Sequence, residues 1–149
     1  MPLLPRAMSD IQRILKESNR KEIHRIWVST KRGETLPGQQ KRLGQILLDH
    51  PQYHNFWEFA DVLGDTEVTD DAGVNPFLHV ALHQVVENQI GDGDLPEAEE
   101  AAARLLRKGL SRDEVVHRIA NPLTKQIFRM LKFGAPFNRA QYVKELRKL

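Results

Sequence analysis

Apolar residues recur at every third or fourth position through almost the whole 149-residue chain. This spacing places them on one face of an α-helix, and no stretch shows the sustained alternation that is typical of β-strands. Proline, glycine and capping residues divide the pattern into about seven segments joined by short loops. The chain is therefore predicted to be all-α, an irregular multi-helix bundle of about six to seven helices.

Several helix boundaries are marked by residue types with a clear local role. Asn75 can cap a helix that is predicted over 77–90. Ser111 and Glu114 have the spacing of a capping box, in which each side chain bonds to the backbone amide of the other residue. A continuous aromatic helix is expected over 51–63, because proline suits the first helical position.

Length and composition restrict the class of protein further. A chain of 149 residues suits one domain, predicted over 9–149, and residues 1–8 are expected to be a disordered leader. With 28% charged residues, the chain has no apolar run near the ~18 residues of a membrane span. Cysteine is absent, and the start of the chain lacks the apolar stretch of a signal peptide. A cytoplasmic protein without membrane contact is the expectation.

Charge is strongly segregated along the chain despite a net charge of only +2. Residues 1–44 carry ten basic and four acidic groups, 45–103 carry none and thirteen, and 104–149 carry twelve and three. The sums are +6, −13 and +9. The basic ends could bind nucleic acid or an acidic partner protein, or they could be solvated helix faces neutralised by the acidic middle.

The main chemical signal is a pair of histidines on the helix that Asn75 caps. His79 and His83 are four residues apart, so their imidazoles lie on one face and can bind the same ion or share one partner. Both fall at the edge of the apolar arc and are expected to face the protein. Glu87 continues the same line and could support the site or serve as an occasional ligand.

Two further pairs have the same spacing. Asp113 and His117 stand four apart beside Glu114, in a string that differs by one residue from the His-Glu-x-x-His helix of zinc hydrolases. Glu114 is the candidate general base, although the capping box alone explains its position. In the last pair, His50 and His54, proline interrupts the helix, and His54 is the better inward candidate because it belongs to the aromatic helix.

These motifs resemble a known family. The strings His-Pro-x-Tyr-His from His50, Asn-Pro-Phe-Leu-His-x-x-x-His from Asn75 and Glu-x-x-His from Glu114, with Tyr-x-x-x-Leu from Tyr142, are similar to the bacterial family known as domain of unknown function 1841. The resemblance spans roughly residues 40 to 149. It implies a small cytoplasmic helical protein with no assigned activity, in which Asp113 stands where histidine is more usual.

Two hypotheses from different classes follow. In the first, the protein holds a divalent metal, with zinc, iron or manganese as candidates, and any catalysis would use Glu114 as the base. The candidate ligands are His54, His79, His83, Asp113 and His117. In the second, the protein is a non-catalytic interaction module whose histidines are structural and whose basic termini contact nucleic acid or an acidic protein.

Overall fold

The computed structural model describes residues 20–64, 66–93 and 95–149, so the predicted leader over 1–8 lies outside the described residues. These residues form eight α-helices and one short 3-10 helix, and none of them forms a strand. The all-α prediction is confirmed, although six to seven helices were too few. No described helix is both long enough and apolar enough to cross a bilayer. In chain order the helices are α2 (Arg20–Lys31), α3 (Gly38–Leu48), η1 (Pro51–Tyr53), α4 (His54–Glu58), α5 (Ala60–Leu63), α6 (Pro76–Gly91), α7 (Pro96–Arg107), α8 (Arg112–Phe133) and α9 (Arg139–Arg147).

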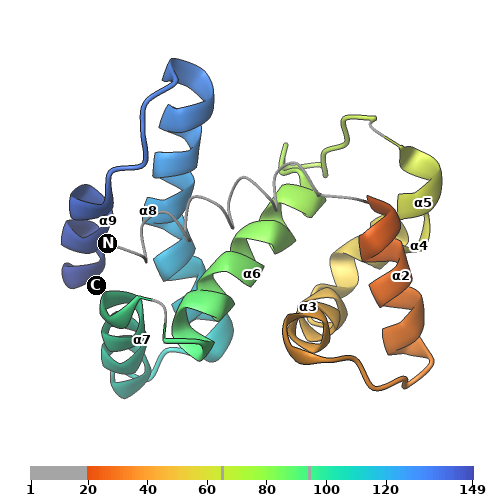
Figure 1. The fold of residues 1–149 in the computed structure, drawn as a ribbon, viewed down its shortest axis with the longest axis horizontal. Helices are drawn as coiled ribbons and strands as arrows, with labels where there is room; N and C mark the ends of the chain where they lie inside the picture. The colour runs from red at the N-terminus through yellow and green to blue at the C-terminus, as the bar shows by residue number, and fades with distance from the viewer. Residues whose placement is uncertain (1–19, 65, 94) are drawn as a thin grey trace. The chain divides into compact units, whose positions relative to one another are not determined.

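Helix packing divides the described residues into two compact units (Figure 1). The first unit ends at Gln84 and the second continues from Val85 to the C-terminus, so that α6 contributes residues to both. Each unit buries apolar side chains of its own. The prediction of one domain over 9–149 is therefore not confirmed.

In the first unit, α2 packs against α3, α4 and α5 around buried aromatic rings. Trp57 is fully buried, and its Nε1 donates a hydrogen bond to the Leu47 carbonyl oxygen at 3.1 Å. Satisfying the indole N–H in this way removes the penalty of burying a polar group. The core of this unit comprises Ile23, Ile26, Trp27, Leu43, Ile46, Leu47, Tyr53, Trp57, Ala60, Phe77 and Val80.

The aromatic helix expected over 51–63 is broken, and this break accounts for the additional helices. It begins as the 3-10 helix η1 and is interrupted at Phe59, whose φ of −108° and ψ of 15° are not helical. Trp57 before the break and Ala60 after it are both completely buried. Both short helices therefore contribute a side chain to one core.

In the second unit, α7, α8 and α9 pack against one another. The Tyr142 hydroxyl of α9 donates to Gln89 Oε1 of α6 at 2.8 Å, and Arg104 of α7 donates to the Leu146 carbonyl oxygen at 2.9 Å. Burial raises the pKa of Tyr142, because ionising a phenol away from water is costly. These bonds join α6 and α7 to α9.

The predicted caps are confirmed. Asn75 Oδ1 accepts hydrogen bonds from the amides of Phe77 and Leu78 at 3.0 and 3.3 Å. At the start of α8, the Glu114 amide donates to Ser111 Oγ and the Ser111 amide donates to the Glu114 carboxylate, which is the complete capping box. Local sequence therefore determines where α6 and α8 begin, and with it the position of the histidines one turn further along each helix.

The contact between α2 and α3 yields a stability prediction. Gly44 is buried in α3, and a Cβ added there would overlap the hydroxyl of Thr30 in α2. Overpacking costs about 1–3 kcal/mol, which exceeds the ~1 kcal/mol that alanine gains over glycine in a helix. We therefore expect Gly44→Ala to lower the free energy of unfolding by about 1 kcal/mol in urea denaturation.

The matched control is Thr30→Ala, which removes the hydroxyl. In that background Gly44→Ala should become neutral or stabilising, because only the helix-propensity gain remains. Equal effects of Gly44→Ala in both backgrounds would show that the two side chains do not compete for this space.

Candidate metal centre

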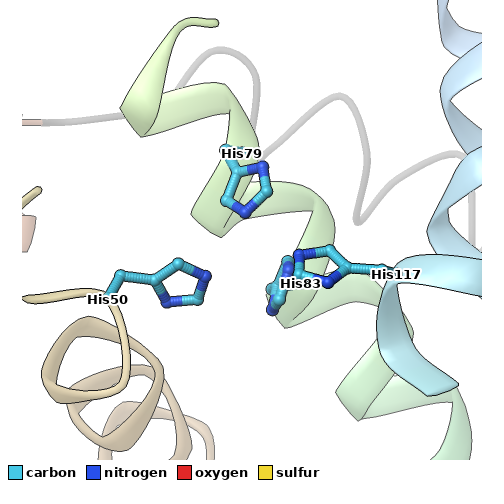
Figure 2. Close-up of side chains that lie close together, drawn as sticks. All are labelled: His50, His79, His83 and His117. Carbon is cyan, nitrogen blue, oxygen red and sulfur yellow. The ribbon is translucent and has the colours of Figure 1, made fainter. Parts of the chain in front are cut away.

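Three histidines of the first unit converge on one small volume. His50, His79 and His83 each offer a ring nitrogen, and these nitrogens lie within 4.8 Å of one another. The ring centroid of His50 is 5.1 Å from that of His79 and 4.7 Å from that of His83. Figure 2 shows the imidazoles of His79 and His83 extending from α6 on the side that His50 faces.

The pair on α6 follows from helix geometry. His79 and His83 are one turn apart, and their ring centroids lie 4.7 Å from each other. His83 is buried and His79 is half-buried. The prediction that these two side chains share a face directed into the protein is thereby confirmed.

His50 reaches the cluster from the turn between α3 and η1. Its backbone has φ −119° and ψ 64°, outside the helical region, because the following residue is Pro51. Its Nδ1 lies 2.7 Å from the Ile46 carbonyl oxygen. A carbonyl oxygen can only accept, so Nδ1 carries the proton and, in the neutral ring, Nε2 carries the lone pair. Metal-binding histidines commonly have this arrangement, with one nitrogen donating to a carbonyl and the other binding the ion.

A tyrosine and an aspartate flank the histidines. The ring of Tyr53 is parallel to that of His50, with centroids 6.2 Å apart, and meets the edge of His79 at 5.8 Å. The Tyr53 hydroxyl donates to Asp70 Oδ2 at 2.7 Å. Loss of solvation and the bond to the Asp70 carboxylate together raise the pKa of Tyr53 to about 12, so the phenol stays protonated at neutral pH.

Asp70 is a strongly hydrogen-bonded carboxylate. In addition to the Tyr53 hydroxyl, it accepts the amides of Ala72 and Val74 at 2.9 Å each. These bonds hold its pKa below the usual range, and the charge of His79 contributes in the same direction. The site therefore has a fixed negative charge close enough to His79 to interact with it.

His54 does not join the cluster, contrary to the preference over His50 that the sequence suggested. Its Nε2 lies 3.2 Å from the Leu48 carbonyl oxygen, and its ring packs at 4.6 Å against Trp27. The reason is that His50 lies outside a helix and η1, which follows it, has about three residues per turn, so a spacing of four residues does not return to the same face. Hence His50 and His54 share no face, and His50 replaces His54 as the candidate ligand.

The remaining predicted residues all belong to the second unit. His117 is exposed, and its Nδ1 lies 3.3 Å from Asp113 Oδ2 one turn earlier in α8. Glu114 is engaged in the capping box, and Glu87 pairs with Arg112 at 2.7 Å. Ligand roles for His117 and Asp113, and a catalytic role for Glu114, stay predictions.

Sequence reasoning ranked His50 below His54 and missed two other members of the site, Tyr53 and Asp70. One usable signal for His50 was Pro51, because a residue before proline leaves the helix and its side chain need not follow the helical face. For Asp70 the Asp-Asp-Ala-Gly stretch indicated a turn, but nothing in the sequence linked that turn to Tyr53.

The fold and the site together define an all-helical protein with a cluster of three histidines on a capped helix and the turn opposite it. The chain belongs to the family described as a domain of unknown function (DUF1841), whose model matches residues 15–148. Comparison with curated proteins finds no match, and comparison with solved structures finds none either. The resemblance drawn from the motifs is confirmed, and the function has to be argued from the site.

Asp70 gives a pH-dependent prediction. A carboxyl group whose pKa is depressed on folding stabilises the native state above its unfolded pKa of about 3.9, and this contribution disappears as the pH falls through the folded value. We expect Asp70→Asn to lower the melting temperature at pH 7, and the difference from the wild type to shrink towards pH 2.5. Thermal melts across this range measure the effect.

The neighbouring Asp71 provides the control, because it is exposed and the Tyr53 and loop-amide bonds are made by Asp70. Asp71→Asn should leave the melting temperature unchanged at both ends of the pH range. A pH-independent difference for Asp70→Asn would mean that the lost hydrogen-bond geometry, and not the charge, was responsible.

Proposed function

We propose that this protein binds one divalent transition-metal ion through the imidazoles of His50, His79 and His83. The observation that carries the proposal is the convergence of their ring nitrogens within 4.8 Å, on a capped helix and on a turn held by its own hydrogen bonds. Three histidines at this separation are a frequent ligand set for such ions. Their charged forms, by contrast, would repel one another in the absence of an anion.

The distances suit an ion after a small adjustment. With zinc–nitrogen bonds of about 2.1 Å, tetrahedral ligands lie about 3.4 Å apart. Nitrogens that start within 4.8 Å therefore need to approach by at most about 1.4 Å, which rotation of the side chains can supply.

The donor set favours zinc and iron over manganese among the metals considered. Neutral imidazole nitrogen suits zinc, iron, copper and nickel, whereas manganese and magnesium prefer carboxylate oxygen. Manganese was a candidate because of Asp113, which belongs to the other unit. Three protein ligands leave a fourth tetrahedral position open, and an open position is the requirement for metal-assisted water activation.

Tyr53 and Asp70 support the site without binding the ion. The Tyr53 ring packs on His50 and His79, and its hydroxyl is held by Asp70. A fixed anion beside His79 offsets part of the charge of a divalent ion, as carboxylates near metal-binding histidines commonly do.

The direct test is zinc titration of the metal-free, full-length protein by calorimetry, together with thermal melts. We expect one ion per chain, and about 2.7 kcal/mol of stabilisation at a free zinc concentration 100-fold above Kd. His50→Ala, His79→Ala and His83→Ala should each weaken binding by at least tenfold. Affinity should also fall from pH 7.5 to pH 5.5, because protons compete for the ring nitrogens.

His54→Ala is the matched control, since His54 is the nearest histidine in sequence to His50 and lies outside the cluster. It should leave zinc affinity unchanged. Retention of full affinity in all three cluster variants, or no zinc binding by the wild type at neutral pH, would leave the histidines with a purely structural role. His117→Ala and Asp113→Ala in the same titration test whether the second unit adds a ligand.

A further inference from the structure

The second unit contains a long segment without negative charge. From Val115 to Lys144 the chain has six lysines and arginines and no aspartate or glutamate. Most of this segment is α8, whose acidic residues are confined to its first turn. A helix with this charge distribution produces a local positive potential that its own side chains do not neutralise.

The basic residues of α8 form a stripe on its exposed face. Arg118, Lys125, Arg129 and Lys132 are all exposed and recur at intervals of seven, four and three residues, which keeps them on one side of the helix. The opposite side carries the buried residues Ile119, Leu123, Gln126 and Ile127. The stripe covers about 21 Å of helix at ~1.5 Å per residue.

These cations are available to a ligand. Within the part of the chain that the structure describes, Arg118, Lys125 and Arg129 pair with no carboxylate. Arg112 and Lys148 of the same unit, by contrast, pair with Glu87 and Glu145 at 2.7 and 3.7 Å. Other exposed basic residues without an ion pair among the described residues, such as Arg107 and Lys144, lie on other helices, so what distinguishes the stripe is that its cations are aligned on one helix face.

Two exposed phenylalanines flank this stripe, one on each side. Phe128 and Phe133 are 59% and 71% exposed, which is unusual for side chains of this size. The Lys132 ammonium nitrogen lies 5.3 Å from the centroid of Phe128 and 5.5 Å from that of Phe133. Aromatic faces and cations are thus interleaved over residues 128–133, about one and a half turns of helix.

We propose that this face of α8, defined by Arg118, Lys125, Phe128, Arg129, Lys132 and Phe133, binds single-stranded nucleic acid. Proteins that bind single strands without sequence preference combine cations that follow the phosphates with aromatic rings on which bases stack. This face provides both, in a row long enough for several nucleotides and without an acidic side chain to repel them. The proposal does not rest on the metal site.

Other partners fit the same face less well. A second copy of the face would bring like charges together, which disfavours self-association. An acidic protein satisfies the cations but leaves no specific role for two exposed rings beside them. A membrane surface would need a broader apolar area than two phenylalanines separated by charged residues.

The experiment is fluorescence anisotropy of the full-length protein with a labelled oligothymidylate of about 20 nucleotides, at several salt concentrations. We expect binding at low salt with a linear dependence of log K on log salt. An abasic chain of the same length should bind more weakly, because it keeps the phosphates and lacks the bases. Polyglutamate and vesicles containing phosphatidylglycerol test the acidic-protein and membrane alternatives.

Two variants separate the contributions of charge and stacking. Lys125→Gln with Arg129→Gln should reduce the magnitude of the salt slope by about 1.4, since each phosphate contact contributes about 0.7. Phe128→Ala with Phe133→Ala should weaken oligothymidylate binding by about tenfold or more and remove its advantage over the abasic chain. All four side chains are exposed, so these changes should leave the melting temperature nearly unchanged.

A control variant on α7, Leu106→Ala with Arg107→Gln, removes one exposed apolar and one exposed basic side chain from another helix. It should leave affinity and salt slope unchanged. The proposal would be overturned by no binding at low salt, by equal affinity for the abasic chain, or by tighter binding to polyglutamate or vesicles. An equal loss of affinity in the α7 control would also overturn it, because the attraction would then be spread over the surface.

Discussion

The hydrogen bond between His50 Nδ1 and the Ile46 carbonyl oxygen determines the chemistry available to the histidine cluster. It fixes which nitrogen of His50 carries the proton, and it holds the ring at the end of α3. Without this bond, a buried imidazole would need another partner or would have to leave the interior. Because His50 is fixed opposite them, His79 and His83 of α6 belong to a cluster of three imidazoles and not only to a pair on one helix.

Several residues around the histidine cluster also stabilise the fold, as helix caps or as part of the apolar core. A small helical unit can therefore hold the cluster without additional elements. Asn75 caps α6 and fixes where the helix begins, which sets the positions of His79 and His83 along it. Tyr53 belongs to the apolar core through its ring and to the site through its hydroxyl. A metal ion would add its binding free energy to a framework that already positions its ligands, so little ordering would remain to oppose binding.

Much of the local structure could be predicted from the sequence, because it depends on neighbouring residues. The caps at Asn75 and Ser111 and the shared face of His79 and His83 are consequences of spacing alone. The break at Phe59 could not be predicted in this way, since helical propensity does not report which side chains the tertiary core must bury.

Contacts between residues far apart in the sequence could not be predicted from the periodicity of apolar residues. That His50 and not His54 lies in the cluster depends on the turn before η1 and on its 3-10 geometry. The hydrogen bond between Tyr53 and Asp70 joins residues that are 17 positions apart in the sequence. Apolar spacing also shows which face of a helix is buried without showing which helices share a core. The division into two compact units could therefore not be predicted from this spacing, and one domain was expected instead.

Zinc K-edge X-ray absorption spectroscopy of the loaded protein tests the central claim most directly, because it reports the ligands of the ion itself. Coordination through His50, His79 and His83 predicts multiple-scattering features of about three imidazoles, with zinc–nitrogen distances of about 2.0–2.1 Å. The imidazole signal should decrease by about one ring in His50→Ala. A spectrum dominated by oxygen ligands, or one that does not change in that variant, would contradict the account.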